Sequence, residues 1–287
     1  MLELDDPEKS ERVADWVELE LSLGEPNFSK SKLTSIVRDS SGVEPSEAFV
    51  SDVWQLLRRR HGLYSSRFFD LRGDLLERCD DVLDGRLEYE VCLMFSLYGA
   101  SAQTGADPKL FERLSAEAIR RYMDGHVFVF GWPVLPDVEA DIAARVRQAS
   151  DALRERFVEA PAVRYKDRGV DIICWRPFFE PDQTARRAGQ LVVLAQCAAG
   201  RDWRRKTTEL PMASWTQYIH WAADPIPAFT APAVIVDDLW HDVAREVRGL
   251  VFDRVRLVNN LSQGVQDAAL RTALQTWRDE QIEEHRS

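Results

Sequence analysis

The sequence from residue 166 to residue 200 reads KDRGVDIICWRPFFEPDQTARRAGQLVVLAQCAAG and holds two short apolar runs joined by a polar segment. VDIICW and QLVVLAQC have the length of β-strands, and no helical pattern separates them. Strands joined in this way are typical of an antiparallel pair. The mean of 171 and 196 falls inside the polar segment 180–188, so we expect Asp171 and Gln196 opposite each other on one face of the sheet.

Asp171 stands at the start of an apolar run, where a carboxylate is costly unless it is paired, hydrogen-bonded or bound to a metal. An acid beside an amide oxygen suits a hard divalent cation such as Mg²⁺, which prefers oxygen ligands. Two other interpretations stay open. Asp171 could bond to the turn after Gly169, and Gln196 could be a buried amide satisfied by neighbouring backbone.

The flanking sequence alternates between strand-like and helix-like patterns. HVFVFGWP (126–133) reads as a strand, and residues 137–157 read as a helix with an apolar face. We expect further strands in PAVIVDD (232–238) and LVFDRVRLV (250–258), the former parallel to QLVVLAQC because a helical stretch lies between them. A long helix is expected from about Ser262. This alternation predicts an α/β sandwich.

The first 105 residues predict a helical region. Their apolar residues recur at intervals of three and four, as in a helix with one buried face. The stripes are Val13, Trp16 and Val17; Leu33, Ile36 and Val37; and Phe49, Val50, Val53, Trp54 and Leu57. We therefore expect a helical region in residues 1–105 and a core with a C-terminal helix in residues 106–287.

Composition narrows the class of protein. The chain has 287 residues, of which 45% are hydrophobic and 30% charged, as is ordinary for a folded soluble protein. No apolar run approaches a membrane span, and the acidic start lacks a signal-peptide pattern, so we expect a cytoplasmic protein without a membrane partner. The four cysteines form no CxxC pair, which favours free thiols, with Cys174 and Cys197 as small buried hydrophobes.

The net charge of −11 argues against a nucleic-acid coat over the whole surface. The local charge can differ from the net charge. The segment from Arg201 to Lys206 (RDWRRK) is basic and contains a tryptophan. A second basic cluster, Arg58–Arg60, ends an expected helix and is more typical of a solvated C-terminus.

The two strands and the helix before them resemble the core of PD-(D/E)xK, or restriction-endonuclease-like, nucleases. In that family an Asp begins one strand of a hairpin, and the next strand carries Glu or Gln, then one residue, then Lys. An acidic residue on a preceding helix often completes the site. KDRGVD ending at Asp171 and QLVVLAQC with Gln196 are similar to these elements, and Glu112 is similar to the helical acid. The resemblance covers roughly residues 108–260.

The resemblance implies an α/β (α+β) fold, with a mixed-sheet core and flanking helices behind the helical region. It also implies phosphodiester hydrolysis with Mg²⁺ or Mn²⁺, held by Asp171, Gln196 and Glu112. Position 198, where the family has lysine, is Ala198. Lys206, or else Lys166, would replace that lysine. Arg201, Arg204, Arg205 and Lys166 would bind nucleic acid, and DNA is expected as the substrate in preference to RNA. Proteins of this kind often serve bacterial restriction or phage defence.

Two other functions remain open. A nuclease-like module without activity could bind a partner protein, a nucleic acid or a second copy of the chain. A different α/β enzyme could use Asp237 and Asp238, although a helix N-cap is the more common role of such a pair. The histidines at 126, 220 and 241 show no partner pattern, so we expect them to be structural.

Overall fold

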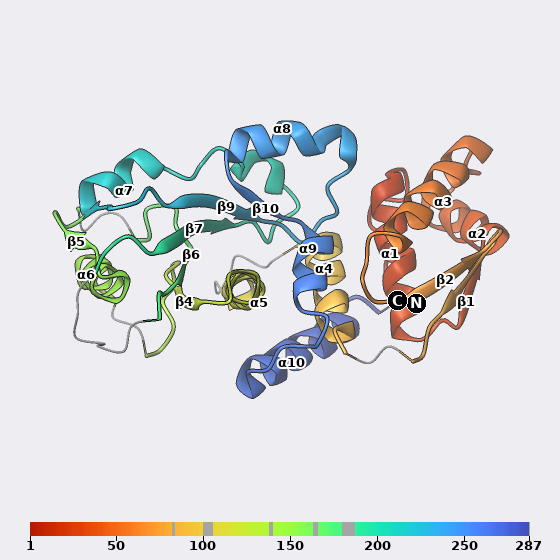
Figure 1. The fold of residues 1–287 in the computed structure, drawn as a ribbon. Coiled ribbons are helices and arrows are strands. Elements are labelled where there is room, and N and C mark those ends of the chain that lie inside the picture. The colour runs from red at the N-terminus through yellow and green to blue at the C-terminus, as the bar shows by residue number, and fades with distance from the viewer. Residues whose placement is uncertain (82–83, 100–105, 138–139, 163–165, 180–186, 287) are drawn as a thin grey trace. The chain divides into compact units, whose positions relative to one another are not determined.

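The computed structural model describes residues 1–81, 84–99, 106–137, 140–162, 166–179 and 187–286 (Figure 1). The chain divides into two compact units. Unit 1 consists of Met1–Gly99 and Arg254–Ser287, and unit 2 of Ala100–Asp253. Within the described residues, no helix has both the length and the apolar character needed to cross a membrane.

Unit 1 is mainly helical, as expected. The residues of the three apolar stripes are buried or partly buried, with Val13, Val17, Leu33, Val53 and Leu57 at 0% exposure. The helices are α1 (Ser10–Leu23), α2 (Lys30–Ser41), α3 (Glu47–His61), α4 (Arg86–Tyr98), α9 (Arg254–Asn260) and α10 (Ala268–Glu284).

Unit 1 also contains a small antiparallel sheet that the sequence reading did not foresee. Its strands are β1 (Asn27–Ser29), β2 (Phe69–Arg72) and β3 (Leu75–Arg78), in the order β1-β3-β2. Arg72 pairs with Leu75, which leaves a two-residue turn. Gly73 opens this turn at φ 61°, a conformation that glycine adopts without strain.

The C-terminal helices belong to unit 1 rather than to the core in which the sequence reading placed them, since α9 and α10 both pack against α4. Helix α10 begins after Asp267, whose side chain caps the amides of Ala269 and Leu270. Its buried residues are Leu270, Leu274 and Trp277, and it begins at Ala268 rather than near Ser262. The periodicity of a helix identifies its buried face but not the surface that covers it.

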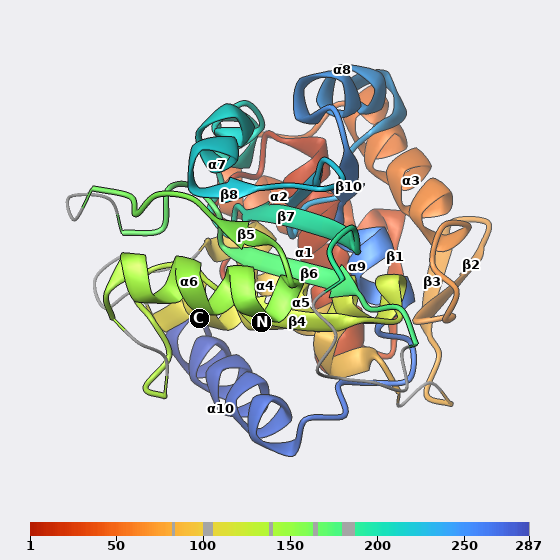
Figure 2. The same cartoon turned by 60° about the vertical axis from the view of Figure 1, so that its left-hand side comes forward.

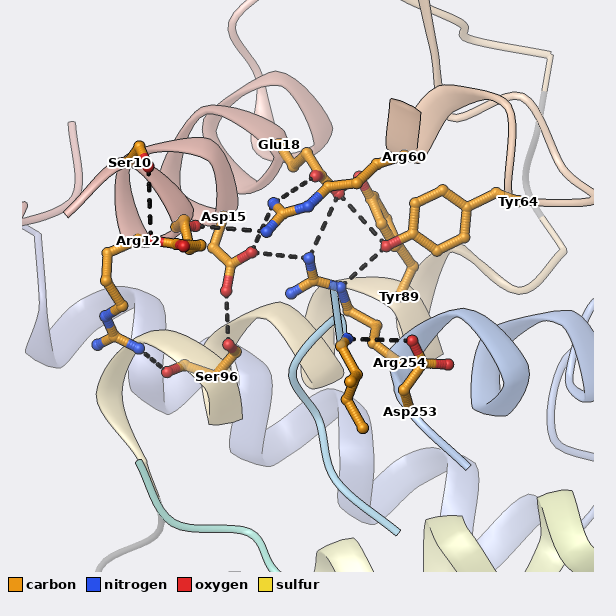
Figure 3. Close-up of polar contacts among 12 residues, drawn as sticks. Ser10, Arg12, Asp15, Glu18, Arg60, Tyr64, Tyr89, Ser96, Asp253 and Arg254 are labelled. Atoms are coloured by element: carbon orange, nitrogen blue, oxygen red, sulfur yellow. Dashed lines mark hydrogen bonds and ion pairs between the residues drawn. The ribbon is translucent and has the colours of Figure 1, made fainter. Parts of the chain in front are cut away.

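A buried ion network lies at the centre of unit 1 (Figure 3). Asp15 Oδ1 lies 2.7 Å from both Arg60 Nη1 and Arg254 Nη2, and Arg60 also pairs with Glu18 at 2.9 Å. The Tyr64 hydroxyl accepts a hydrogen bond from Arg254 Nε at 2.9 Å. Burial alone would raise the pKa of Asp15, but the two guanidinium groups outweigh it and hold that pKa well below its usual range.

Unit 2 is built on a five-stranded mixed sheet. The strand order is β10-β9-β7-β6-β4; β4, β6 and β7 are antiparallel neighbours, and β7, β9 and β10 are parallel neighbours. The strands are β4 (His126–Val129), β6 (Ile172–Arg176), β7 (Leu191–Cys197), β9 (Ile226–Thr230) and β10 (Leu250–Phe252). A separate pair joins β5 (Arg156–Phe157) to β8 (Ile219–His220). The mixed α/β fold class expected from the sequence is confirmed.

Helices cover this sheet. Figures 1 and 2 show α7 and α8 on one side of it and α5 on the other. The helices are α5 (Ala106–Met123), α6 (Ile142–Leu153), α7 (Met212–Tyr218) and α8 (Asp237–Val247), with a short 3₁₀ helix η1 (Trp203–Lys206). Residues of α6 and α7 pack with Ile173, Val192 and Leu194 of the sheet, and residues of α8 pack with Phe229 and Val251.

The β6–β7 pairing confirms the predicted hairpin and its register. The paired residues run from Ile172 opposite Ala195 to Arg176 opposite Leu191. Asp171 and Gln196 lie one position beyond this pairing, where the Asp171 amide donates to the Ala195 carbonyl. The loop between the strands includes residues 180–186, which lie outside the described residues.

Two predicted strands were misplaced. The strand parallel to β7 is Ile226–Thr230, not PAVIVDD. Proline at positions 225 and 227 made this segment an unlikely strand by sequence rules, because proline lacks the donor of a sheet hydrogen bond. PAVIVDD is apolar because Ile235 packs beneath α8. LVFDRVRLV is divided between β10 and α9.

Candidate metal centre

Asp171 is fixed where the pairing of β6 and β7 ends. Its amide donates to the Ala195 carbonyl at 2.9 Å, and its carbonyl accepts from the amides of Phe130 and Gly131 at 2.7 and 2.9 Å. Its carboxylate Oδ2 accepts from the Cys197 amide at 2.7 Å. The backbones of both neighbouring segments therefore hold the Asp171 side chain in place.

Glu112 of α5 lies close to Asp171. A Cβ atom at Gly131 would lie 2.5 Å from Glu112 Oε2 and 2.7 Å from Asp171 Oδ1. The two carboxylates therefore converge on the backbone of Gly131, in space that only a glycine leaves open. Glu112 is 5% exposed.

Both carboxyl groups resist ionisation. Burial raises the pKa of Glu112 to about 8; the Asp171 carboxylate adds to this rise, and the Lys109 ammonium opposes it. Burial raises the pKa of Asp171 to about 6; the Cys197 amide opposes the rise and Asp167 adds to it. Two buried acids with raised pKa values at one point are typical of a site that performs chemistry or binds a cation.

Gln196 supplies an amide oxygen without a hydrogen-bond donor. The residue is 6% exposed, and its Oε1 is buried with no hydrogen-bond partner among the described residues. Its Nε2 donates to Glu209 Oε2 at 3.3 Å. This orientation leaves the acceptor atom available, although buried acceptors are normally satisfied.

These residues fit a hard divalent cation. Mg²⁺ is commonly bound through one or two carboxylates and keeps several waters, so Glu112 and Asp171 with an amide oxygen are a suitable donor set. Within the described part of the chain, no group of three or more His, Cys, Asp and Glu side chains could hold a metal ion. The candidate centre therefore offers two acidic ligands, Glu112 and Asp171, rather than a group of three.

The three positions considered for the motif lysine have different surroundings. Ala198, two residues after Gln196, is buried in the core beneath α8. Lys206 is exposed on η1, yet its charge is close enough to lower the pKa of Asp171. The Lys166 ammonium lies 4.8 Å from the centre of the Trp132 ring.

Lys109 is the lysine that sequence reasoning missed. Its ammonium forms a short ion pair with Glu112 Oε2 and donates to the Gly131 carbonyl at 2.7 Å. The residue is 7% exposed. The sequence shows that Lys109 lies three residues before Glu112, and residues at that interval share a helix face. The sequence does not show that Lys109 is buried.

The basic segment around η1 is only partly available to a ligand. Both Arg204 Nη atoms pair with the Glu246 carboxylate, Nη2 at 2.7 Å. Arg201 and Arg205 are exposed. Arg205 is therefore a better candidate for phosphate contact than Arg204.

The other sequence candidates do not join this site. Asp237 and Asp238 lie exposed in the first turn of α8, where the helix dipole favours acidic side chains. The N-cap residue is Val236, so the prediction that Asp237 or Asp238 caps this helix is wrong. Both residues lie inside the helix, at its first two positions. Cys174 and Cys197 are buried free thiols, as expected.

Comparison with known proteins gives few matches. No family model and no curated protein matches the chain. Among solved structures, the MspJI restriction endonuclease in complex with a 27-mer oligonucleotide is 11% identical, covers 85% of this chain and 45% of that one, and has a TM-score of 0.33. Restriction endonuclease FokI is 10% identical over 88% of this chain and 44% of that one, with a TM-score of 0.27. FokI bound to DNA is 9% identical over 93% of this chain and 46% of that one, with a TM-score of 0.21.

This chain thus corresponds to less than half the length of each of these enzymes. At these identities and TM-scores, the likeness carries no conclusion about the function of this chain.

Proposed function

We propose that this protein is a divalent-metal-dependent nuclease that hydrolyses phosphodiester bonds, with DNA as the first substrate to test and RNA as the second. The observation that carries the proposal is the convergence of Glu112 Oε2 and Asp171 Oδ1 on Gly131. Two buried acids held together are costly as anions, and a bound cation offsets that cost. A role in bacterial restriction or phage defence would be one setting for such an activity.

Each residue then has a defined task. Asp171 and Glu112 would hold Mg²⁺ or Mn²⁺, and the Gln196 amide oxygen would be the third protein ligand. The cation would supply Lewis acidity, which polarises the scissile phosphate and lowers the pKa of a water. Because the ligands must be ionised, cation binding displaces the proton that burial keeps on Glu112.

Positive side chains act on the substrate. Lys206 lies near enough to Asp171 to affect its charge, and it stabilises negative charge that develops on the phosphate. Arg205 and Arg201 contact flanking phosphates, and Lys166 is a further candidate. Arg204 contributes after its pair with Glu246 opens.

The test is cleavage of plasmid, linear DNA and RNA with Mg²⁺, with Mn²⁺ and with EDTA. We expect cleavage that needs the metal and falls by at least about 10²-fold in Asp171→Asn. Asp237→Asn, in an exposed aspartate outside the site, is the matched control and should keep full activity. Loss of activity in the control but not in Asp171→Asn would instead favour an enzyme centred on Asp237.

Ala198 favours a second candidate, a nuclease-like module that binds a partner or a nucleic acid without cutting it. A buried alanine at that position leaves the hairpin without its own ammonium group. Nucleic-acid binding by the wild type with no cleavage under any metal condition would support this candidate.

A further inference from the structure

Lys109 occupies an unusual position for a lysine. It is almost fully buried near the start of α5, and both of its described contacts lie at the candidate metal centre. Its charge lowers the pKa of Glu112 and that of Asp171, so both acids lie within its field. A buried ammonium is retained only where paired anions and hydrogen bonds offset its desolvation.

The contact involves the oxygen that a metal would use. Lys109 bonds to Glu112 Oε2, and that same oxygen converges with Asp171 Oδ1 on Gly131. Two cations a few ångströms apart in a poorly solvated site repel each other strongly. The ammonium and a divalent ion therefore compete for Glu112.

We propose that Lys109 is an internal counter-cation that occupies the metal position in the metal-free protein, and that a divalent ion must displace it to bind. This inference rests on the proposed function, because it assumes that Glu112 and Asp171 are the metal ligands. It adds a regulatory element: once Glu112 has lost its proton, Lys109 neutralises the carboxylate until the metal arrives. Displacement also releases an ammonium group beside the reaction centre, which supplies what Ala198 lacks.

The first experiment measures Ca²⁺ binding by calorimetry for the full chain at pH 9, where proton competition at Glu112 is small. Lys109→Met keeps the length of the side chain and removes its charge, and Lys109→Gln also keeps a donor for the Gly131 carbonyl. We expect both variants to bind Ca²⁺ roughly tenfold more tightly than the wild type, or more. Lys9→Met is the control, because Lys9 is an exposed lysine of unit 1 whose described ion pair is with Asp6. It should change the affinity much less.

The second experiment needs no variant. An amine-reactive ester, with the labelled sites identified by mass spectrometry, should modify Lys109 slowly in EDTA and severalfold faster with saturating Ca²⁺. Labelling that stays unchanged while Ca²⁺ binds would overturn the proposal, as would Lys109→Met and Lys109→Gln affinities equal to or weaker than the wild-type value. If the wild type and all variants bind Ca²⁺ equally, the proposed role of Lys109 is refuted but the proposed metal site stands. If none of them binds Ca²⁺, both the role of Lys109 and the metal site are refuted.

Discussion

Replacing Glu112 with glutamine should change how stability depends on pH. Burial raises the pKa of Glu112 from 4.5 to about 8, so the folded protein keeps a proton there that the unfolded chain releases. The stability that this proton provides is complete below pH 4.5 and is lost as the pH rises to about 8. Glutamine resembles the protonated acid and does not titrate.

The size of the effect follows from these values. At about 1.4 kcal/mol for each pH unit, the rise in pKa corresponds to about 5 kcal/mol in all. About 3 kcal/mol of this falls between pH 6 and pH 9, because the unfolded carboxyl is already largely ionised at pH 6. Relative to wild type, Glu112→Gln should therefore gain about 3 kcal/mol of unfolding free energy over that interval.

The assay is urea denaturation at pH 6 and pH 9 with EDTA present. Glu117→Gln is the control on the same helix: Arg120 and Arg121 hold the pKa of Glu117 below its usual value, against the effect of burial. Its stability relative to wild type should not change between pH 6 and pH 9. If the unfolding free energy of Glu112→Gln relative to wild type is also the same at pH 6 and pH 9, Glu112 is already ionised at pH 6. That result would refute the reasoning.

Three further predictions follow from single contacts. Arg254→Met should lower the unfolding free energy by about 3–5 kcal/mol, because it removes one of the two guanidinium groups that pair with the buried Asp15 carboxylate, and an unchanged urea midpoint would contradict this. Gly131→Ala places a methyl group against Glu112 Oε2 and should reduce cleavage by about 10²-fold; wild-type cleavage rates would count against the site. Arg205→Ala should reduce the salt dependence of nucleic-acid binding by about one phosphate contact, measured by titration at several salt concentrations.

The hairpin could be predicted because its information is local. The two apolar runs and the polar segment between them determine which residues face each other, and the register that sets Ile172 opposite Ala195 follows from counting. Glu112 could be nominated only through a family resemblance, and its convergence with Asp171 depends on the backbone of Gly131, which no pattern marks.

Other features depend on distant contacts. PAVIVDD and the true strand Ile226–Thr230 are both short and apolar, and only the packing of Ile235 under α8 distinguishes them. Lys109 carries a charge that usually indicates solvent exposure, so its burial could not be read from the chain. The sequence also did not indicate that α10 packs against α4, because all of unit 2 lies between these two helices along the chain.

The division of unit 1 into two segments has a consequence for biosynthesis. Asp15 is made early, but Arg254 follows it by 239 positions, after all of unit 2 has been translated. Until then Asp15 has one of its two arginine partners, and α4 lacks the helices that later cover it. Since chains emerge from the ribosome at about 5–20 residues per second, the first 99 residues wait roughly ten seconds or more for the last pieces of their core. Unit 2, which is continuous, can complete its fold first, so the second half of the molecule is expected to mature before the first.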